Sequence, residues 1–176
     1  MNIGYKKLRN DYIAELEILG KTNENRDDIA NPQYAKYRTS KVKVLKIFHM
    51  NDEMQVIQQM NGFYDENFIY IVGKEMHVSD YDENVNNVCS QGIHYFKTQY
   101  QAKMWNLYLN NCTGKYIAWH ENGNKKLEGE YKNGNYEGKW ISWYENSTLQ
   151  YEWEYKNGNY EGKWIYKDGN KIYERK

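Results

Sequence analysis

A tandem repeat limits what the last third of this chain can fold into. The decapeptide Lys-Asn-Gly-Asn-Tyr-Glu-Gly-Lys-Trp-Ile begins at Lys132 and again at Lys156, 24 residues later, and Gly114, Gly138 and Gly162 keep the same spacing. A fixed period of about 20–50 residues is typical of architectures in which each unit buries its apolar face against its neighbours. The repeat therefore predicts a stacked structure and, with it, a binding or scaffolding role.

Turn residues divide each repeat unit into two strands. Asn-Gly occurs at 122–123, 133–134 and 157–158, and Asp168-Gly169 serves the same purpose in the last unit. The type I′ turn of a two-residue hairpin needs positive φ at both central positions, which Asn and Gly adopt at low cost. The sequence therefore predicts hairpins with these turns. At Asn146-Ser147 a serine replaces the glycine, and we expect local strain or a longer loop there.

The segments between the turns alternate in polarity. Apolar side chains at positions 149, 151, 153 and 155 alternate with polar ones, which predicts one apolar and one charged face. Gly138 shares a side with Trp140, and we expect it to leave room for an aromatic ring above the backbone. Trp119, Ile141 and Trp143 fall on the opposite side, where they either pack against the first domain or form an interaction surface.

The repeat units resemble a known family. Written Tyr-Lys-Asn-Gly-Asn-Tyr-Glu-Gly-Lys-Trp, with Trp-Ile-x-Trp-Tyr after the glycine, they are similar to MORN repeats, in a divergent variant, over about residues 110–173. Proteins with MORN repeats are generally scaffolds and protein-interaction modules. They often dimerise, and some have been proposed to contact phospholipids. The resemblance implies an antiparallel β-hairpin ribbon with no chemistry of its own.

Aromatic side chains are the expected partner-binding residues of this ribbon, because aromatic anchors dominate many protein interfaces. The candidates are Trp119, Trp140, Trp143, Tyr144, Trp153 and Trp164. The expected partner is another protein or a second copy of the chain, with a dimer favoured.

The first 108 residues predict a strand-rich α+β domain. Period-two alternation predicts strands at 12–18 and 41–48, and shorter apolar runs predict strands at 68–72 and 76–78 around a tight turn, and at 89–96. Helices are predicted at 51–59 and at 99–108, the second with a capping box formed by Thr98 and Gln101. Polar segments 20–31 and 80–87 predict surface loops. We therefore expect an α+β domain at 1–108, followed by the hairpin repeats at 109–176.

This first region also carries a resemblance. The ordered motifs Tyr-Ile-Ala-Glu-Leu-Glu-Ile at 12–18, Lys-Tyr-Arg-Thr-Ser-Lys-Val-Lys-Val-Leu at 36–45, Tyr64-Asp65 with Phe-Ile-Tyr-Ile-Val-Gly at 68–73, and Cys-Ser-Gln-Gly-Ile-His-Tyr-Phe at 89–96 resemble an uncharacterised domain. That domain is commonly attached to pentapeptide or other repeats in proteins of large DNA viruses and phages. The resemblance covers about residues 10–108 and implies no activity. Residues 84–88 depart from the family's usual approach to the cysteine.

Charge and apolar content narrow the classes of partner and compartment. The chain has 24 basic and 24 acidic side chains, and Lys alternates with Glu in the repeat, so the clustered cations that bind nucleic acid are missing. The same balance argues against attraction to an anionic membrane. The N-terminus lacks an apolar signal core and no run reaches the length of a membrane span. We therefore expect a cytoplasmic protein, in the host cytoplasm or a virion if viral, with Cys89 and Cys112 as thiols.

Few residues form a pattern typical of a catalytic or metal-binding site. The weak catalytic candidates are Cys89 and His94, which could act as nucleophile and base, together with Arg38. A metal site formed by Cys89, His94, Cys112 and His120 matches no established zinc spacing. The acidic loop with Asp80, Asp82 and Glu83 lacks the ligand pattern of an EF-hand.

The sequence therefore predicts a non-enzymatic interaction or scaffold protein with no metal and no cofactor. The alternative is that the first domain is an enzyme or nucleotide-binding unit with a site near Arg38, Tyr70 and His94, and that the repeats target it. A pocket joining these three residues would favour this alternative.

Overall fold

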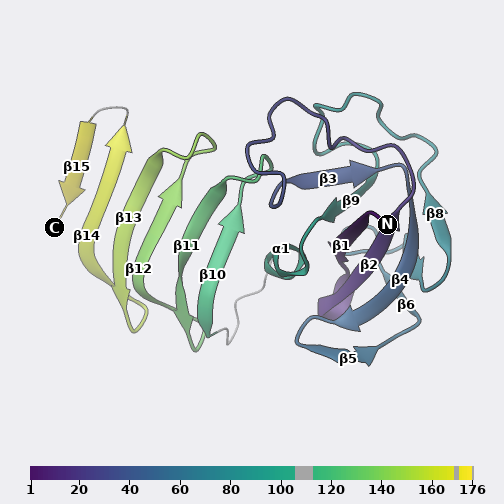
Figure 1. The fold of residues 1–176 in the computed structure, drawn as a ribbon. Coiled ribbons are helices and arrows are strands. Elements are labelled where there is room, and N and C mark those ends of the chain that lie inside the picture. The colour runs from purple at the N-terminus through teal and green to yellow at the C-terminus, as the bar shows by residue number, and fades with distance from the viewer. Residues whose placement is uncertain (106–112, 169–170, 176) are drawn as a thin grey trace. The chain divides into compact units, whose positions relative to one another are not determined.

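Antiparallel β-sheets make up most of the structure (Figure 1). The computed structural model describes residues 1–105, 113–168 and 171–175, with side chains described up to residue 161. The chain divides into two compact units, Met1–Trp105 and Asn106–Lys176. The expectation of a strand-rich chain with antiparallel sheets is thus confirmed, and each unit is described here by itself.

The first unit contains β-strands, a short 3₁₀ helix and an α-helix. Its elements are β1 (Ile3–Lys7), η1 (Arg9–Asp11), β2 (Tyr12–Ile18), β3 (Lys36–Thr39), β4 (Lys41–His49), β5 (Asp52–Val56), β6 (Gln59–Asn61), β7 (Ile69–Ile71), β8 (Glu75–His77), β9 (Ile93–Phe96) and α1 (Gln99–Met104). The main sheet has the order β3-β9-β1-β2-β4-β5, and β8 also pairs with β4. A second sheet consists of β6 and β7.

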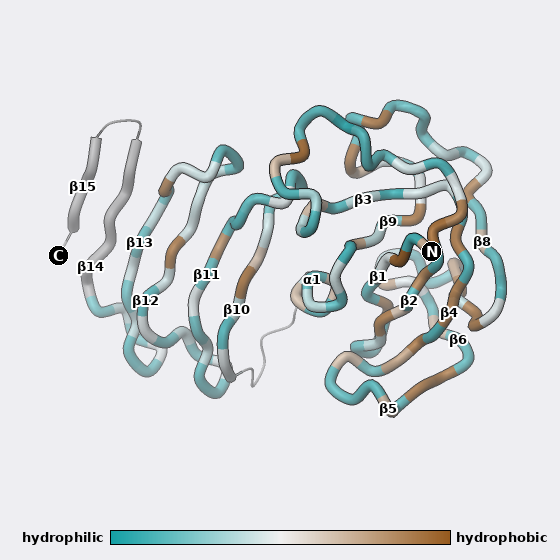
Figure 2. The backbone as a smooth tube through the Cα atoms, in the orientation of Figure 1, coloured by the Kyte–Doolittle hydropathy of each residue, from teal (hydrophilic) through white to brown (hydrophobic). Residues whose placement is uncertain are grey.

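Alternation in β2 and β4 builds the core of the first unit. Both strands lie where the sequence predicts them, and Leu16 pairs with Val44 and Ile18 with Val42 across the ladder. Successive side chains point to opposite faces of a sheet, so Leu16, Val42 and Val44 share one face and belong to one buried cluster, whereas Ile13 and Phe48, which pair with each other, are buried outside it. In Figure 2 both strands carry brown, apolar stretches. The buried cluster contains Leu8, Tyr12, Ala14, Leu16, Val42, Val44, Ile47, Tyr70 and Ile93.

The helix predicted at 51–59 is wrong. The chain turns after Met50 and returns as β5, which pairs with the end of β4, so Phe48 lies opposite Val56. Met54 is 88% exposed, although the helical interpretation needed it on the buried face. Pairing with an existing strand therefore overrides the local spacing of apolar residues, as tertiary context often does.

Two further strand predictions need correction. The strands expected at 68–72 and 76–78 do not pair with each other, because β7 pairs with β6 and β8 pairs with β4. The strand expected at 89–96 begins only at Ile93. Residues before it belong to a loop, and the backbone oxygen of Gln91 accepts a hydrogen bond from the Arg38 guanidinium instead of a neighbouring strand.

The segment at 20–31 is a loop, but part of it is buried. Asn23 is fully buried, and its side-chain oxygen accepts from the backbone N–H of Arg38 at 2.8 Å. Arg26 is only 4% exposed, and it donates to the backbone oxygen of Lys36 at 2.6 Å and lies over the ring of Tyr37. The loop is therefore hydrogen-bonded to β3. The polar character of its residues does not by itself predict this burial.

Helix α1 begins where the capping residue predicts. The hydroxyl of Thr98 accepts from the backbone N–H of Gln101 at 3.2 Å. The reciprocal bond of a capping box is not made, because the Gln101 side chain donates to the backbone oxygen of Tyr34. The helix ends at Met104, four residues earlier than predicted, and positions 106–108 lie outside the described residues.

The second unit is a ribbon of consecutive strands. Its elements are β10 (Gly114–Trp119), β11 (Lys125–Lys132), β12 (Asn135–Trp143), β13 (Leu149–Lys156), β14 (Asn159–Asp168) and β15 (Lys171–Arg175). Each strand pairs with the next one in the chain, and all of these pairs are antiparallel. Successive units are also tied at their turns, where Asn124 Nδ2 donates to the backbone oxygen of Glu145 at 2.7 Å.

The turns of the ribbon are of two kinds. At Asn133-Gly134 both residues have positive φ, at 51° and 79°, and Asn157-Gly158 has the same values, so these two-residue turns are confirmed. At Asn122-Gly123 the structure differs from the prediction. There the N–H of His120 bonds the oxygen of Asn124, which closes a three-residue loop, and only Gly123 has positive φ.

Ser147 takes the place of that glycine in the next unit. Its φ is 64°, and the N–H of Tyr144 bonds the oxygen of Thr148, so the loop has the same form as the one before it. The longer loop is thus a property of this end of the ribbon and not a consequence of the serine. Gly169 lies outside the described residues.

Two glycines of the ribbon have roles other than the one predicted. A Cβ on Gly138 would meet nothing within 4 Å, so this residue makes no room for a ring. Its φ of 62° is the reason for glycine, because side chains rarely adopt this backbone conformation. The ring lies over Gly129 instead, where an added Cβ would fall 2.1 Å from Cδ2 of Trp140.

Candidate functional site

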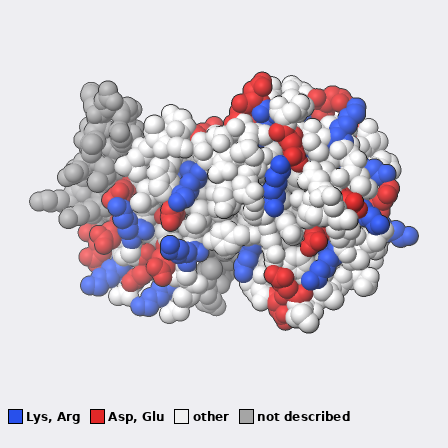
Figure 3. Space-filling view, in the orientation of Figure 1, with Lys and Arg blue, Asp and Glu red and all other residues white. Residues whose placement is uncertain are grey.

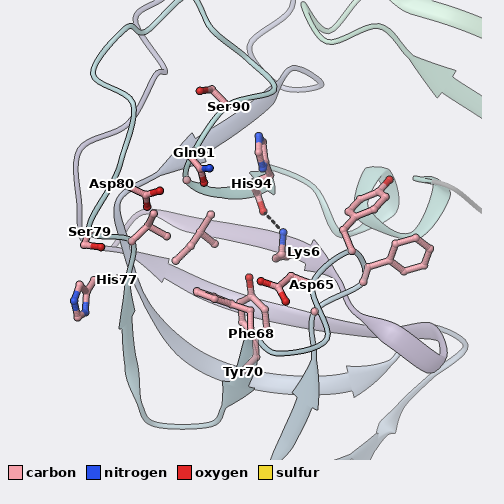
Figure 4. Close-up of a pocket in the computed structure, with 16 residues that line it drawn as sticks. Lys6, Asp65, Phe68, Tyr70, His77, Ser79, Asp80, Ser90, Gln91 and His94 are labelled. Carbon is pink, nitrogen blue, oxygen red and sulfur yellow. Dashed lines mark hydrogen bonds between the residues drawn. The ribbon is translucent and has the colours of Figure 1, made fainter.

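A pocket of about 460 Å³ opens in the first unit (Figure 4). It lies where β1, β7, β8 and β9 meet the loops that precede them, so residues far apart in the sequence share its wall. Aromatic side chains of Phe63, Tyr64, Phe68 and Tyr70 contribute apolar surface. The polar lining residues are Lys6, Asp65, His77, Ser79, Asp80, Ser90, Gln91 and His94.

The ammonium of Lys6 lies within this pocket. Figure 4 shows it between Gln91 and His94 on one side and Phe68 and Tyr70 on the other. Its Nζ donates to the backbone oxygen of His94 at 3.1 Å and lies 6.0 Å from the centroid of the Tyr70 ring. Burial, assisted by the charge of Lys36, lowers the pKa of Lys6 to about 8. Lys6 is a functional candidate that the sequence analysis missed.

His94 is held as a neutral ring. Burial is the largest cause, and the charges of Lys6, Lys36 and Arg38 add to it, so that the pKa of His94 falls to about 4. Its Nε2 lies 2.9 Å from the backbone oxygen of Val88. A carbonyl can only accept, so Nε2 carries the hydrogen and donates it. This nitrogen is therefore committed to the loop and does not serve as a base.

The low pKa of His94 makes stability depend on pH. The unfolded chain, with an ordinary value of 6.5, binds a proton more readily than the folded protein, whose value is about 4. The free energy of unfolding should thus fall as pH drops from 6.5 to 4, by up to about 1.4 kcal/mol per pH unit. Urea unfolding across this range should show a shallower slope for His94→Gln than for the wild type. Equal slopes would contradict this assignment.

Arg38 lies beneath the neighbouring loop and does not line the pocket. It is fully buried, and its guanidinium donates to four backbone oxygens: those of Asp82 and Asn87, each at 2.6 Å, and those of Asn84 and Gln91. The ring of Tyr81 covers it at 4.8 Å. Tyr70 and His94 therefore both line the pocket, whereas Arg38, although paired with His94 across β3 and β9, is not among the lining residues, so no pocket joins the three predicted residues.

Cys89 is exposed on the same loop. Its sulfur accepts from Nζ of Lys36 at 2.9 Å, whereas Nε2 of His94 is engaged with Val88. The two side chains therefore do not form the hydrogen-bonded nucleophile and base that the sequence had placed together as candidates.

The acidic side chains of this loop are used within the protein. The carboxylate of Asp82 accepts from the hydroxyl of Ser90, from the side chain of Asn87 and from the backbone N–H of Asn84, and these bonds lower its pKa to about 2. Glu83 pairs with Lys21 at 2.7 Å. Among the residues that the structure describes, no group of three or more His, Cys, Asp or Glu side chains is arranged to hold a metal ion, and Cys112 lies outside them.

The second candidate surface is one face of the ribbon, which we call the aromatic face. Strand register and ring contacts place its members together: Tyr116, Tyr131, Tyr136, Trp140, Tyr151, Trp153, Tyr155 and Tyr160. The rings of Tyr136 and Tyr155 stack at 4.9 Å. Tyr136, Tyr151 and Tyr160 are 38%, 37% and 47% exposed. In Figure 2 strands β10 to β13 are mostly pale or teal with short brown segments, because Tyr and Trp score low on this hydropathy scale.

The predicted partner-binding residues have different environments. Trp140 is fully buried, with the rings of Tyr131 and Tyr136 at 4.9 and 4.7 Å, so it belongs to the core and not to an exposed surface. Tyr144 is exposed, whereas Trp119, Trp143 and Trp153 are half-buried. Lys125 lies over the Trp143 ring at 5.2 Å. The side chain of Trp164 lies outside the described residues.

The opposite face of the ribbon is charged and internally paired. Ile117 lies across from Glu128, which lies across from Ile141, and Glu152 follows on the next strand. Lys139 bonds Glu152 at 2.6 Å. Figure 3 shows basic and acidic side chains side by side on the described parts of both units. Lys139 thus has an acidic partner on this face.

Comparison with known proteins places the first unit in a family. The model of a family of unknown function (DUF5758) matches residues 1–102, which is more than half of the 176 residues. The chain belongs to this family. The DUF5758 match spans nearly all of the first unit, including the pocket, and ends before the ribbon. No curated protein and no solved structure matches the chain.

Within the described residues of this DUF5758 protein, no helix is both long enough and apolar enough to cross a bilayer.

Proposed function

We propose that this chain is a non-enzymatic interaction protein in which the ribbon binds a protein partner, in the manner of the MORN repeats that its units resemble. In this proposal a strand-rich α+β unit is followed by a MORN-like scaffold. The observation that supports it best is the aromatic face, where Tyr136, Tyr151 and Tyr160 remain 37–47% exposed. Contiguous exposed apolar surface commonly marks an interaction site.

The chemistry of the ribbon favours a protein over other partners. Tyr and Trp are enriched at the energetic centres of protein interfaces, because they bury large areas at a small cost in side-chain entropy. Nucleic acids and anionic membranes would need unpaired cations, whereas Lys125 and Lys139 are bonded to Glu128 and Glu152. We therefore propose a protein surface as the ligand.

We propose that the protein partner is a second copy of the chain. The residues that define the aromatic face, all of them with described side chains, are uncharged and would not repel an identical set, and the chain has a net charge of zero. Strands β10 and β15 each have only one recorded neighbour in the ribbon, and such edges pair readily with another chain. The proposed assembly is a dimer through the ribbon.

Sedimentation of the full chain tests this proposal. The wild type should form a dimer at micromolar concentration, and the double variant Tyr151→Gln/Tyr160→Gln should weaken it about tenfold or more, because truncating interface anchors costs about 2 kcal/mol. Both residues are exposed, so the fold should persist. Lys139→Gln, on the charged face, is the matched control and should dimerise as the wild type does. A strict monomer at high micromolar concentration would overturn self-association.

A further inference from the structure

We propose that the pocket of the first unit binds a small oxyanion, a carboxylate or phosphate attached to an aromatic body, and that Lys6 binds its charge. This inference concerns the DUF5758 unit and is independent of the function proposed for the ribbon.

The argument begins with the unbalanced charge of Lys6. An ammonium group has three donors, and the bond recorded for Nζ is the one to the neutral backbone oxygen of His94. Among the ion pairs between described residues, none involves Lys6. Lys6 is half-buried, and a partly desolvated charge without a counter-ion is costly, so a ligand that supplies one has a free-energy advantage.

The surrounding charges favour an anion over a cation. Lys36 and Arg38 act on the same region, since both contribute to the lowered pKa of His94. The acidic lining residues, Asp65 and Asp80, are exposed, so water and salt weaken their fields, although the charge of Asp65 still acts on Tyr70. Asp65 also accepts from the backbone N–H of Asn67 at 2.9 Å. A cationic ligand would instead meet the ammonium of Lys6 inside the pocket.

The side chains that line the pocket indicate the chemistry of the ligand's uncharged part. A volume of about 460 Å³ falls within the range of small-molecule sites, about 300–1,000 Å³. Phe68 and Tyr70 lie beside Lys6 in Figure 4, with their rings 5.3 Å apart, and form an apolar surface for a planar group. Burial raises the pKa of Tyr70, so its hydroxyl stays protonated and can donate to an oxyanion. Apolar walls with a few convergent donors are typical of sites for such ligands.

Calorimetry on the full chain with two probes tests the proposal. Benzoate and phenyl phosphate represent the two forms of the oxyanion, and the tighter binder identifies which one the pocket prefers. Lys6→Met should weaken binding about tenfold or more, the loss expected for a hydrogen bond to a charged group. Lys74→Met, which removes an exposed lysine outside the pocket lining, should bind as the wild type does. Equal affinity of Lys6→Met and the wild type would overturn the assignment.

A second measurement requires no variant and remains informative if Lys6→Met fails to fold. Saturating probe should raise the pKa of the Lys6 amine above its value of about 8, which 13Cε resonances report by NMR. Failure of both probes to bind saturably, or an unchanged Lys6 titration, would contradict the proposal. The Tyr151→Gln/Tyr160→Gln variant should bind both probes normally. Probe binding by the first unit is thus tested separately from dimerisation through the ribbon.

Discussion

Replacing Arg38 with Met should destabilise the first unit by about 3 kcal/mol or more. The side chain is fully buried and donates to four backbone oxygens of the segment 82–91. Hydrogen bonds to a charged group contribute about 1.5–3 kcal/mol each, and polar groups left unsatisfied add a further cost. Methionine fills similar space but restores none of these bonds, so the loop should detach from β3.

Urea unfolding, combined with hydrogen exchange of residues 82–91, measures this effect. Arg38→Lys should recover part of the stability, because one ammonium keeps the charge but cannot reach four oxygens in the planar arrangement of a guanidinium. Arg9→Met is the matched control: its partner Glu66 is 3.0 Å away, and both side chains are exposed, so the loss should stay below about 1 kcal/mol. Similar losses at positions 9 and 38 would show that the guanidinium does not hold the loop.

Gly129→Ala should produce the largest effect of a single methyl group in the ribbon. The added Cβ would lie 2.1 Å from Cδ2 and 2.3 Å from Cε2 of Trp140. Trp140 is fully buried among other rings, so it has little room to move. Overpacking of this kind costs about 1–3 kcal/mol, and a rigid indole places the expected value at the upper end. Unfolding followed by tryptophan fluorescence measures the loss.

Two comparisons separate this steric effect from backbone strain. Gly138→Ala should cost about 1 kcal/mol, because φ is 62° there but a Cβ would meet nothing within 4 Å. In a Trp140→Leu background, Gly129→Ala should lose most of its effect, since the clashing ring is gone, and a double-mutant cycle reports that coupling. Additive effects of the two substitutions would contradict the contact.

Local patterns predicted those elements whose environment follows from nearby residues. Alternation located β2 and β4, and Asn-Gly located the turns at 133–134 and 157–158, because strand period and turn φ are local properties. The strand β3 was not predicted. All four of its residues are buried, yet Lys36 and Arg38 are charged, so it does not read as an apolar strand. Their burial depends on partners such as Cys89 and Asn87, about 50 positions away in the chain.

The candidate site could likewise be predicted only in part from local sequence patterns. Tyr70 and His94 were singled out from the sequence and do share a pocket, but Arg38 does not join them and Lys6 was overlooked. Lys6 lies on β1, which pairs with β2 and with β9. Pairing between segments so far apart is set by the whole sheet, so no spacing rule could have brought Lys6 beside His94.

The neighbour-to-neighbour pairing of the ribbon bears on how such a chain can change length. Each strand from β10 to β15 pairs only with strands adjacent in sequence. Duplicating or deleting one 24-residue unit would leave every remaining strand with an equivalent neighbour, and stability would change by roughly one unit's share. The first unit cannot gain or lose a segment in this way, because β1 pairs with β9, which comes from the far end of the unit's sequence. Gene duplication can therefore set the reach of the ribbon in steps while the DUF5758 unit stays constant.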